Sequence, residues 1–117
     1  MDTTISVVYY NCIYAMHYEW DEEKNRLNQK KHGISFEVAA LVFEDENCLV
    51  RLERVDETGE QRWLAIGTAR LNASTPVIMF VVHVYREEID GEEITRIISA
   101  RRADKNEVRR YQEQEMD

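Results

Sequence analysis

The chain has 117 residues, a net charge of −8 at neutral pH, and only four glycines and one proline. This length suits one domain with a single modest core, and an apolar fraction of 44% argues against a disordered chain. The longest apolar run, over 5–16, is too short to span a bilayer, too polar for the apolar region of a signal peptide, and not preceded by basic residues. Nothing in it argues for a membrane span or for export. Because Cys12 and Cys48 form no CxxC pair and lack metal-like spacing to histidine, we expect reduced thiols in a cytoplasmic protein.

The N-terminal region contains a segment that is difficult to assign. Residues 1–15 are either an added strand or a dispensable extension, and we favour the extension because the strong structural signals begin only after Met16. Residues 16–20 are a candidate for a short strand that would add to the sheet. We therefore expect a single domain over 16–117.

Two helices are predicted next. Asp21 is a suitable N-cap, and basic residues followed by Gly33 are typical of a helix end, so the first helix is predicted over 21–32. Ser35 is the next N-cap, and apolar residues at helical spacing predict a second helix over 35–44.

The hydrophobic period then changes from that of a helix to that of strands. Turn signals at 56–60 and 89–92 separate alternating segments, and a capping box of Asp104 and Glu107 predicts a closing helix over 104–114. Strands joined by short turns pair antiparallel, and the preceding helices would cover one face. The predicted fold is α+β, with two N-terminal helices packed on a four-stranded antiparallel meander and a closing C-terminal helix. The predicted strands cover 49–55, 62–70, 77–85 and 93–101.

Strand alternation assigns side chains to the two faces of this sheet. In the strand over 77–85, one parity is uniformly apolar (Ile78, Phe80, Val82, Val84) and should lie under the helices. The other parity places His83 and Tyr85 on the open face, and Arg101 of the next strand is expected beside them. Arg62 and Arg96 share the parity of apolar neighbours, which means either that they curl outward at strand ends or that the true register differs.

Positive charge is concentrated in one segment of this acidic chain. Residues 96–111 contain six basic and two acidic residues. Arginines on an open sheet face suit phosphodiester chemistry, since a guanidinium binds phosphate through two parallel hydrogen bonds and stabilises a pentavalent transition state. A nearby histidine could move the required proton. The plainer alternatives are a structural strand histidine, and a helix whose arginines only face solvent or pair with carboxylates.

Several motifs together resemble the BrnT family of bacterial toxins over about 18–111. The motifs are Tyr-Glu-Trp-Asp-Glu-Glu-Lys at 18–24, Lys-His-Gly-Ile-Ser-Phe at 31–36, and Arg-Ile-Ile-Ser-Ala-Arg-Arg-Ala at 96–103. The resemblance implies a RelE-like ribonuclease fold and a type II toxin–antitoxin system. It also implies a ribbon-helix-helix antitoxin that masks the toxin and represses their shared promoter, so that DNA is contacted only through the antitoxin. Residues 1–15 are a departure, since family members usually start close to the Trp-Asp motif.

The function expected from this resemblance is metal-independent endoribonuclease activity that inhibits growth, with RNA as substrate and no cofactor or metal. The alternative is an inactive interaction protein that binds the antitoxin and acts in transcriptional autoregulation. His32 is open to two interpretations, catalytic residue or helix terminator. The predicted site comprises the catalytic residues His83, Arg62, Arg86, Arg101 and His32, and the RNA-binding residues Arg96, Lys31, Tyr85 and Arg102.

Overall fold

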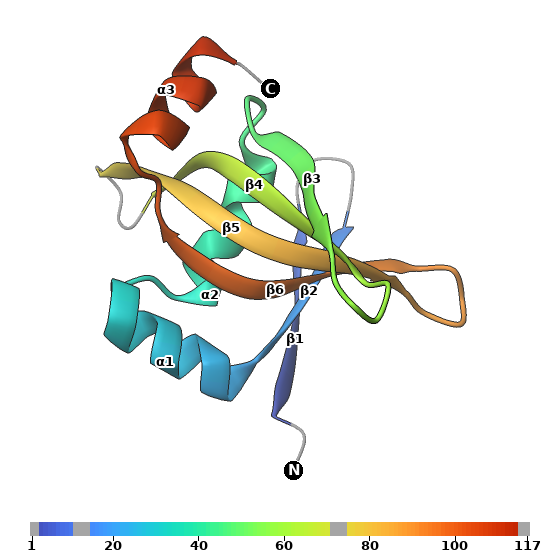
Figure 1. The fold of residues 1–117 in the computed structure, drawn as a ribbon. Coiled ribbons are helices and arrows are strands. Elements are labelled where there is room, and N and C mark those ends of the chain that lie inside the picture. Colours follow the sequence, from blue (N-terminus) through green and yellow to red (C-terminus); the bar gives the residue numbers. More distant parts are fainter. Residues whose placement is uncertain (1–2, 11–14, 71–74, 115–117) are drawn as a thin grey trace.

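A mixed sheet of six strands forms the centre of the fold (Figure 1). The computed structural model describes residues 3–10, 15–70 and 75–114. The elements are β1 (Thr4–Tyr10), β2 (Ala15–Asp21), α1 (Glu22–His32), α2 (Phe36–Ala39), the 3-10 helix η1 (Ala40–Glu44), β3 (Leu49–Val55), β4 (Gln61–Arg70), β5 (Pro76–Glu87), β6 (Glu93–Arg102) and α3 (Lys105–Glu113). The strand order is β1-β2-β6-β5-β4-β3, in which β2 and β6 are parallel and all other neighbours are antiparallel.

The α+β class is confirmed, but the predicted four-stranded antiparallel sheet is wrong. The strands β3 to β6 do pair antiparallel in sequence order, and β2 then joins the free side of β6 in parallel. This contact consists of two residue pairs, Tyr18 with Thr95 and Glu19 with Arg96. A parallel partner is reached through a long crossover, here α1 to β5, so short turn signals could not reveal it.

The N-terminal residues contribute a strand. Among the alternatives for residues 1–15, the structure contains the added strand, since β1 pairs with β2 along its whole length, from Thr4 opposite Asp21 to Tyr10 opposite Ala15. The Tyr9 ring lies 5.4 Å from that of Tyr18, and its hydroxyl donates a hydrogen bond of 2.8 Å to the Glu37 carbonyl. That the domain folds and functions without residues 1–15 stays a prediction.

The helix α1 begins and ends as predicted, but it is anchored by polar side chains. Asp21 accepts a hydrogen bond from the Glu23 amide, and Gly33 ends the helix in the left-handed conformation with φ of 71°. The buried Asn28 side chain donates to the Ala100 carbonyl at 2.8 Å and accepts from the Ala100 amide at 3.3 Å. The Asn28 side chain therefore supplies hydrogen-bond partners to the backbone at the edge of β6, beyond the point where β2 stops pairing with this strand.

The predicted helix over 35–44 is α2 followed by η1, and both pack on one face of the sheet (Figure 1). Ser35 caps α2 by accepting a hydrogen bond from the Val38 amide at 3.1 Å. The tight approach of η1 depends on Gly67 of β4, because a Cβ at this position would lie 2.8 Å from Val42. A glycine is therefore needed there for packing.

The faces of β5 are the reverse of the prediction. Met79, Val81 and His83 are fully buried on the side of α2 and η1, whereas Phe80 and Val82 lie on the other side and are partly exposed. Both parities of this strand are apolar, so alternation alone could not decide which one faces the helices. The expectation that His83 and Tyr85 lie on the open face beside Arg101 is therefore wrong.

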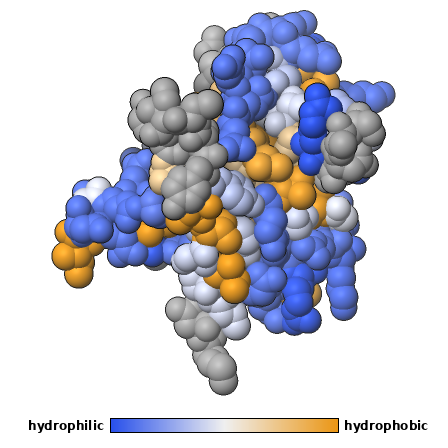
Figure 2. Space-filling model, turned by 180° about the vertical axis from the view of Figure 1, so that it is seen from behind, coloured by the Kyte–Doolittle hydropathy of each residue, from blue (hydrophilic) through white to orange (hydrophobic). Residues whose placement is uncertain are grey.

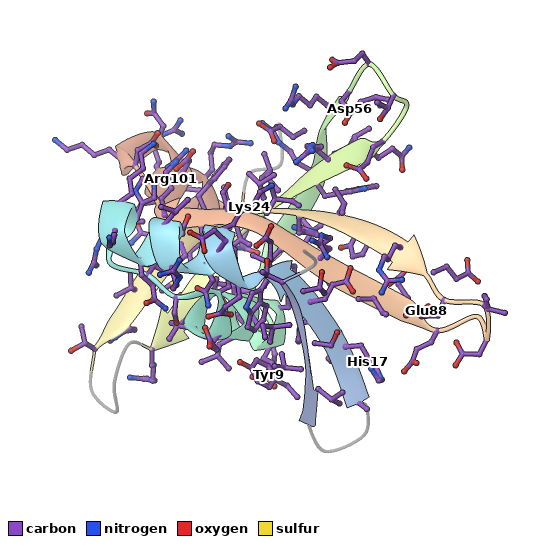
Figure 3. All side chains as sticks on the ribbon, turned by 90° about the horizontal axis from the view of Figure 1, so that it is seen from below. Tyr9, His17, Lys24, Asp56, Glu88 and Arg101 are labelled. Carbon is purple, nitrogen blue, oxygen red and sulfur yellow. The ribbon has the colours of Figure 1, made fainter. Side chains whose placement is uncertain are left out.

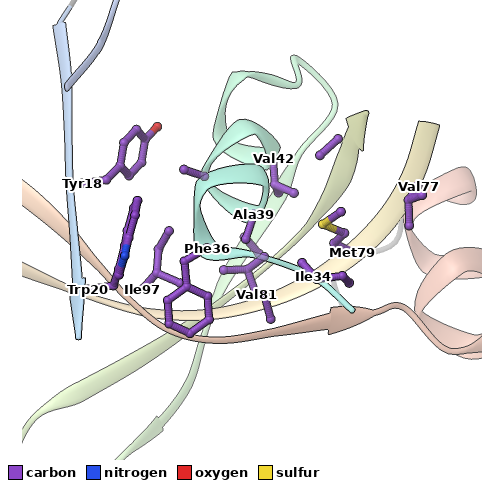
Figure 4. Packing of buried hydrophobic residues seen from close by; sticks show 14 residues of the cluster. Tyr18, Trp20, Ile34, Phe36, Ala39, Val42, Val77, Met79, Val81 and Ile97 are labelled. Carbon is purple, nitrogen blue, oxygen red and sulfur yellow. The ribbon is translucent and has the colours of Figure 1, made fainter. Parts of the chain in front are cut away.

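The core lies between the sheet and the helices α2 and η1 (Figure 4). Trp20 and Phe36 meet edge to face with their ring centroids 6.2 Å apart, and both are fully buried.

Asp104 and Glu107 form the predicted capping box at the start of α3. No helix within the described residues is long and apolar enough to cross a membrane. The face seen in Figure 2 shows apolar surface broken up by hydrophilic residues.

Candidate functional site

The strand register directs seven arginines of the described strands to the face of the sheet that α2 and η1 leave uncovered. Six of them, all except Arg70 at the last position of β4, form what is called here the arginine face. Two β-bulges produce this arrangement, since the β3 ladder skips Glu53 and the β6 ladder skips Ile98. In Figure 3, Arg101 lies on one side of the sheet and Tyr9, which contacts α2, lies on the other. The members of the arginine face are Arg51, Arg54, Arg62, Arg86, Arg96 and Arg101.

Arg86 and Arg96 meet at one carboxylate. Glu19, only 2% exposed, accepts hydrogen bonds of 2.6 Å from both Nε and Nη2 of Arg86 and of 3.0 Å from Nη1 of Arg96. The hydrogen bonds from Arg86, helped by those from Arg96, hold the pKa of Glu19 below its ordinary value against the opposing effect of burial. The Nη2 atom of Arg86 also donates to Glu88 at 3.0 Å, so Arg86 is shared between two carboxylates, whereas Arg96 pairs with Glu19 alone among acidic side chains within the described residues. A phosphate could take the place of the exposed Glu88 carboxylate at Arg86.

Arg101 lies at the other end of β6, next to α3. Its Nη1 and Nη2 atoms donate to the two carboxylate oxygens of Glu107 at 2.8 and 2.9 Å. Its guanidinium also stacks on Phe80, 4.2 Å from the ring centroid. This arginine thus joins α3 to the sheet, and a phosphate would have to bind beside an existing bidentate ion pair.

Arg62 lies near the turn between β3 and β4. It forms weak ion pairs with Asp56 at 3.8 Å and Glu60 at 3.4 Å. Its buried Nε atom has no hydrogen bond within the described part of the chain. This donor is therefore less committed to protein acceptors than the guanidinium groups of Arg86 and Arg101.

His83 and Tyr85 contact each other but lie away from the arginine face. The Nε2 atom of His83 is 3.1 Å from the Tyr85 hydroxyl, and the imidazole packs edge to face on Phe43 with the centroids 4.8 Å apart. Burial lowers the pKa of His83 to about 4, so the ring is neutral at neutral pH. This environment is typical of a structural histidine, and a catalytic role for His83 stays a prediction.

The remaining predicted residues lie at the end of the sheet where Asn28 attaches α1 to β6. Lys31 and His32 occupy the last turn of α1, where positive charge favours the helix dipole. Arg102 pairs with the core residue Met79, so it belongs to the face opposite to that of Arg101. The structure therefore gathers four predicted arginines on one face and separates them from His83, Tyr85 and Arg102.

Sequence reasoning missed Glu19 as a site residue. An acidic residue between Tyr18 and Trp20, which are both large and apolar, was the available signal, since a charged residue inside a buried strand needs a partner. Sequence reasoning also missed the attachment of α3 to the body. The Tyr111 hydroxyl donates to Asp45 and accepts from Thr68 at 3.0 Å.

Other reactive groups contribute little to this site. Burial raises the pKa of the Cys48 thiol to about 12, so it stays protonated, and Cys12 lies outside the described residues. Within residues 3–10, 15–70 and 75–114 there is no group of three or more histidine, cysteine, aspartate or glutamate side chains arranged to hold a metal ion.

Comparison with known proteins gives the family. No curated protein matches the chain. Residues 20–107, which include β4 to β6 and the contributions of those strands to the arginine face, match the family described as "Ribonuclease toxin, BrnT, of type II toxin-antitoxin system". The chain therefore belongs to the BrnT family of ribonuclease toxins in type II toxin–antitoxin systems.

Proposed function

We propose that this ribonuclease toxin binds and cleaves RNA on the arginine face, as an endonuclease that needs no metal ion. The observation that supports this best is the pair of Arg86 and Arg96 around the buried Glu19, with Arg62 and Arg101 on the same face. Phosphate groups along RNA would meet guanidinium donors on several strands. The apolar floor of this face includes Ile66 and would support their alkyl stems.

The reaction assigned to this face is internal transesterification. The 2′-hydroxyl oxygen attacks the adjacent phosphorus, the bond from phosphorus to the 5′-oxygen breaks, and the products are a 2′,3′-cyclic phosphate and a 5′-hydroxyl. The arginines stabilise the extra negative charge of the pentavalent transition state. Because His83 is buried on the opposite side and neutral, we assign removal of the 2′-hydroxyl proton to hydroxide from solvent, which becomes water, rather than to this histidine. A solvent water then gives a proton to the leaving 5′-oxygen and restores the hydroxide.

The experiment that tests this proposal is cleavage of a defined single-stranded RNA by the purified toxin in excess chelator. Cleavage with 2′,3′-cyclic phosphate ends is expected, at a rate unchanged by the chelator. The logarithm of the rate should rise with pH through the neutral range without a plateau near a histidine pKa. Cleavage that requires added magnesium, or products with a 5′-phosphate, would overturn the proposed reaction.

The partner assigned to this toxin is an antitoxin of the ribbon-helix-helix type. Membership of a type II toxin–antitoxin family implies an antitoxin, and we propose that it binds DNA while the toxin contacts DNA only through it. We place the toxin in the cytoplasm, where its RNA substrate is found. Copurification with the product of the neighbouring reading frame, and relief of growth arrest by that product, would support this assignment. Growth arrest that no neighbouring product relieves would contradict it.

A further inference from the structure

A second surface of the toxin lies at the same end of the sheet as the β3–β4 turn, on the face opposite to the arginines. It is a cleft of about 500 Å³. Trp63 and Tyr85 belong to the parity of β4 and β5 that faces away from the arginine face. We call this surface the aromatic–acidic cleft, and its main lining residues are Val55, Glu60, Trp63, Tyr85 and Glu93.

The aromatic wall of the cleft is held in place. The rings of Trp63 and Tyr85 meet at 61° with their centroids 5.7 Å apart. The Tyr85 hydroxyl lies 3.1 Å from the Nε2 atom of His83, which is fully buried. Tyr85 itself remains 38% exposed, so part of this wall is available to a ligand. An exposed aromatic surface of this kind favours a ligand with a flat or cationic group.

The charge of the cleft identifies the kind of ligand. Glu60 and Glu93 line the cleft and form its acidic rim, and the neighbouring Glu92 lies outside it in close contact with His17. Glu60 is shared with Arg62 at 3.4 Å, whereas the Glu93 carboxylate has no hydrogen bond or ion pair within the described residues. A phosphate would be repelled here, but an arginine or lysine side chain would meet a carboxylate and a ring face together.

We propose that the aromatic–acidic cleft binds an arginine or lysine side chain from a cationic segment of the toxin's protein partner. The proposal rests on the proposed function only in taking the antitoxin as the source of that segment. RNA and the antitoxin then use opposite faces of the sheet for this contact. An antitoxin bound at the cleft would be retained without competing for the same arginines as RNA.

The test uses the full toxin and a short peptide probe that carries two arginines, with a matched peptide in which both are citrulline. Citrulline keeps the shape and removes the charge. The arginine peptide should shift the NMR signal of the Trp63 indole N–H, while the signal of the fully buried Trp20 stays in place as an internal reference. Equal shifts with both peptides, or none with the arginine peptide, would overturn the proposal.

Two matched variants sharpen this test. Glu93→Gln should weaken binding of the arginine peptide at least threefold, whereas Glu57→Gln, an exposed acid in the β3–β4 turn outside the cleft, should not. Unchanged affinity of Glu93→Gln for the arginine peptide would contradict the proposed contact between the peptide and the Glu93 carboxylate. Because Glu93 is not on the arginine face, its variant should cleave RNA at the rate of the wild type. Absence of RNA cleavage by the wild type would count against the proposed function and not against the cleft.

Discussion

Arg96 and Arg101 lie on the same face of β6 although five positions separate them, an odd spacing that regular alternation would place on opposite faces. The bulge at Ile98 removes one residue from the ladder and restores the alignment. Arg96 can thereby bind Glu19 while Arg101 stacks on Phe80. The alignment of these two arginines on one face therefore depends on one irregularity of the backbone.

Replacing Glu19 by glutamine should separate substrate binding from catalysis. The amide keeps the size of the side chain but removes the negative charge that orients Arg86 and Arg96. RNA should bind more tightly, because the face gains one positive charge, while kcat falls at least tenfold as the guanidinium groups lose their fixed positions. Steady-state kinetics at two salt concentrations measure both effects. Glu23→Gln, which removes the exposed partner of Arg26, is the control and should change neither value.

Replacing Arg101 by alanine should loosen α3 as well as impair RNA cleavage. The substitution leaves the buried Glu107 without its bidentate partner and uncovers Phe80. We expect a loss of about 1–3 kcal/mol in the free energy of unfolding, measured by denaturant titration. Arg109→Ala removes an exposed pair with Glu113 on the same helix and should cost less than about 0.5 kcal/mol. Equal losses in the two variants would show that Arg101 does not anchor α3.

His83 should make the toxin less stable in mild acid. Its pKa in the folded chain, about 4, is below the ordinary value of 6.5, so the unfolded chain takes up a proton first as the pH falls. The contribution of the neutral His83 to the free energy of unfolding is complete above pH 6.5 and is lost progressively as the pH falls toward 4. At pH 5 the loss is roughly 2 kcal/mol. Denaturant titrations at pH 7.5 and pH 5 measure this loss. Between these two pH values the free energy of unfolding should fall less in His83→Gln than in the wild type, by that amount. An equal fall in both proteins would contradict the assignment of a lowered pKa to His83.

Removing residues 1–10 should destabilise the domain. The deletion uncovers the edge of β2 and removes Tyr9, which packs on Tyr18 and donates to the Glu37 carbonyl. We expect the free energy of unfolding to fall by more than about 2 kcal/mol, whereas Tyr9→Phe alone, which removes only the hydroxyl, should cost about 1 kcal/mol. Chemical denaturation compares the three proteins. An unchanged midpoint in the deleted chain would instead support a dispensable extension.

Local signals predicted the helices well and the sheet only in part. Asp21, Ser35 and Asp104 are N-caps as expected, because a cap is a contact between residues close in sequence. The orientation of β5 and the parallel pairing of β2 with β6 depend on residues far apart in the chain, and the bulge at Ile98 has no marker such as glycine. Four arginines of this face were identified from their chemistry, whereas Arg51, Arg54 and the shared partner Glu19 were missed.

The most direct measurement of the central claim is RNA cleavage by the double variant Arg86→Gln/Arg96→Gln, in chelator and at a concentration where the wild type is active. Both arginines bind the same carboxylate on the arginine face, so their loss should lower kcat/KM at least a hundredfold. Circular dichroism checks that the variant is folded. Arg26→Gln, an exposed arginine of α1, should retain full activity. Wild-type cleavage by a folded double variant would contradict the assignment of RNA to this face.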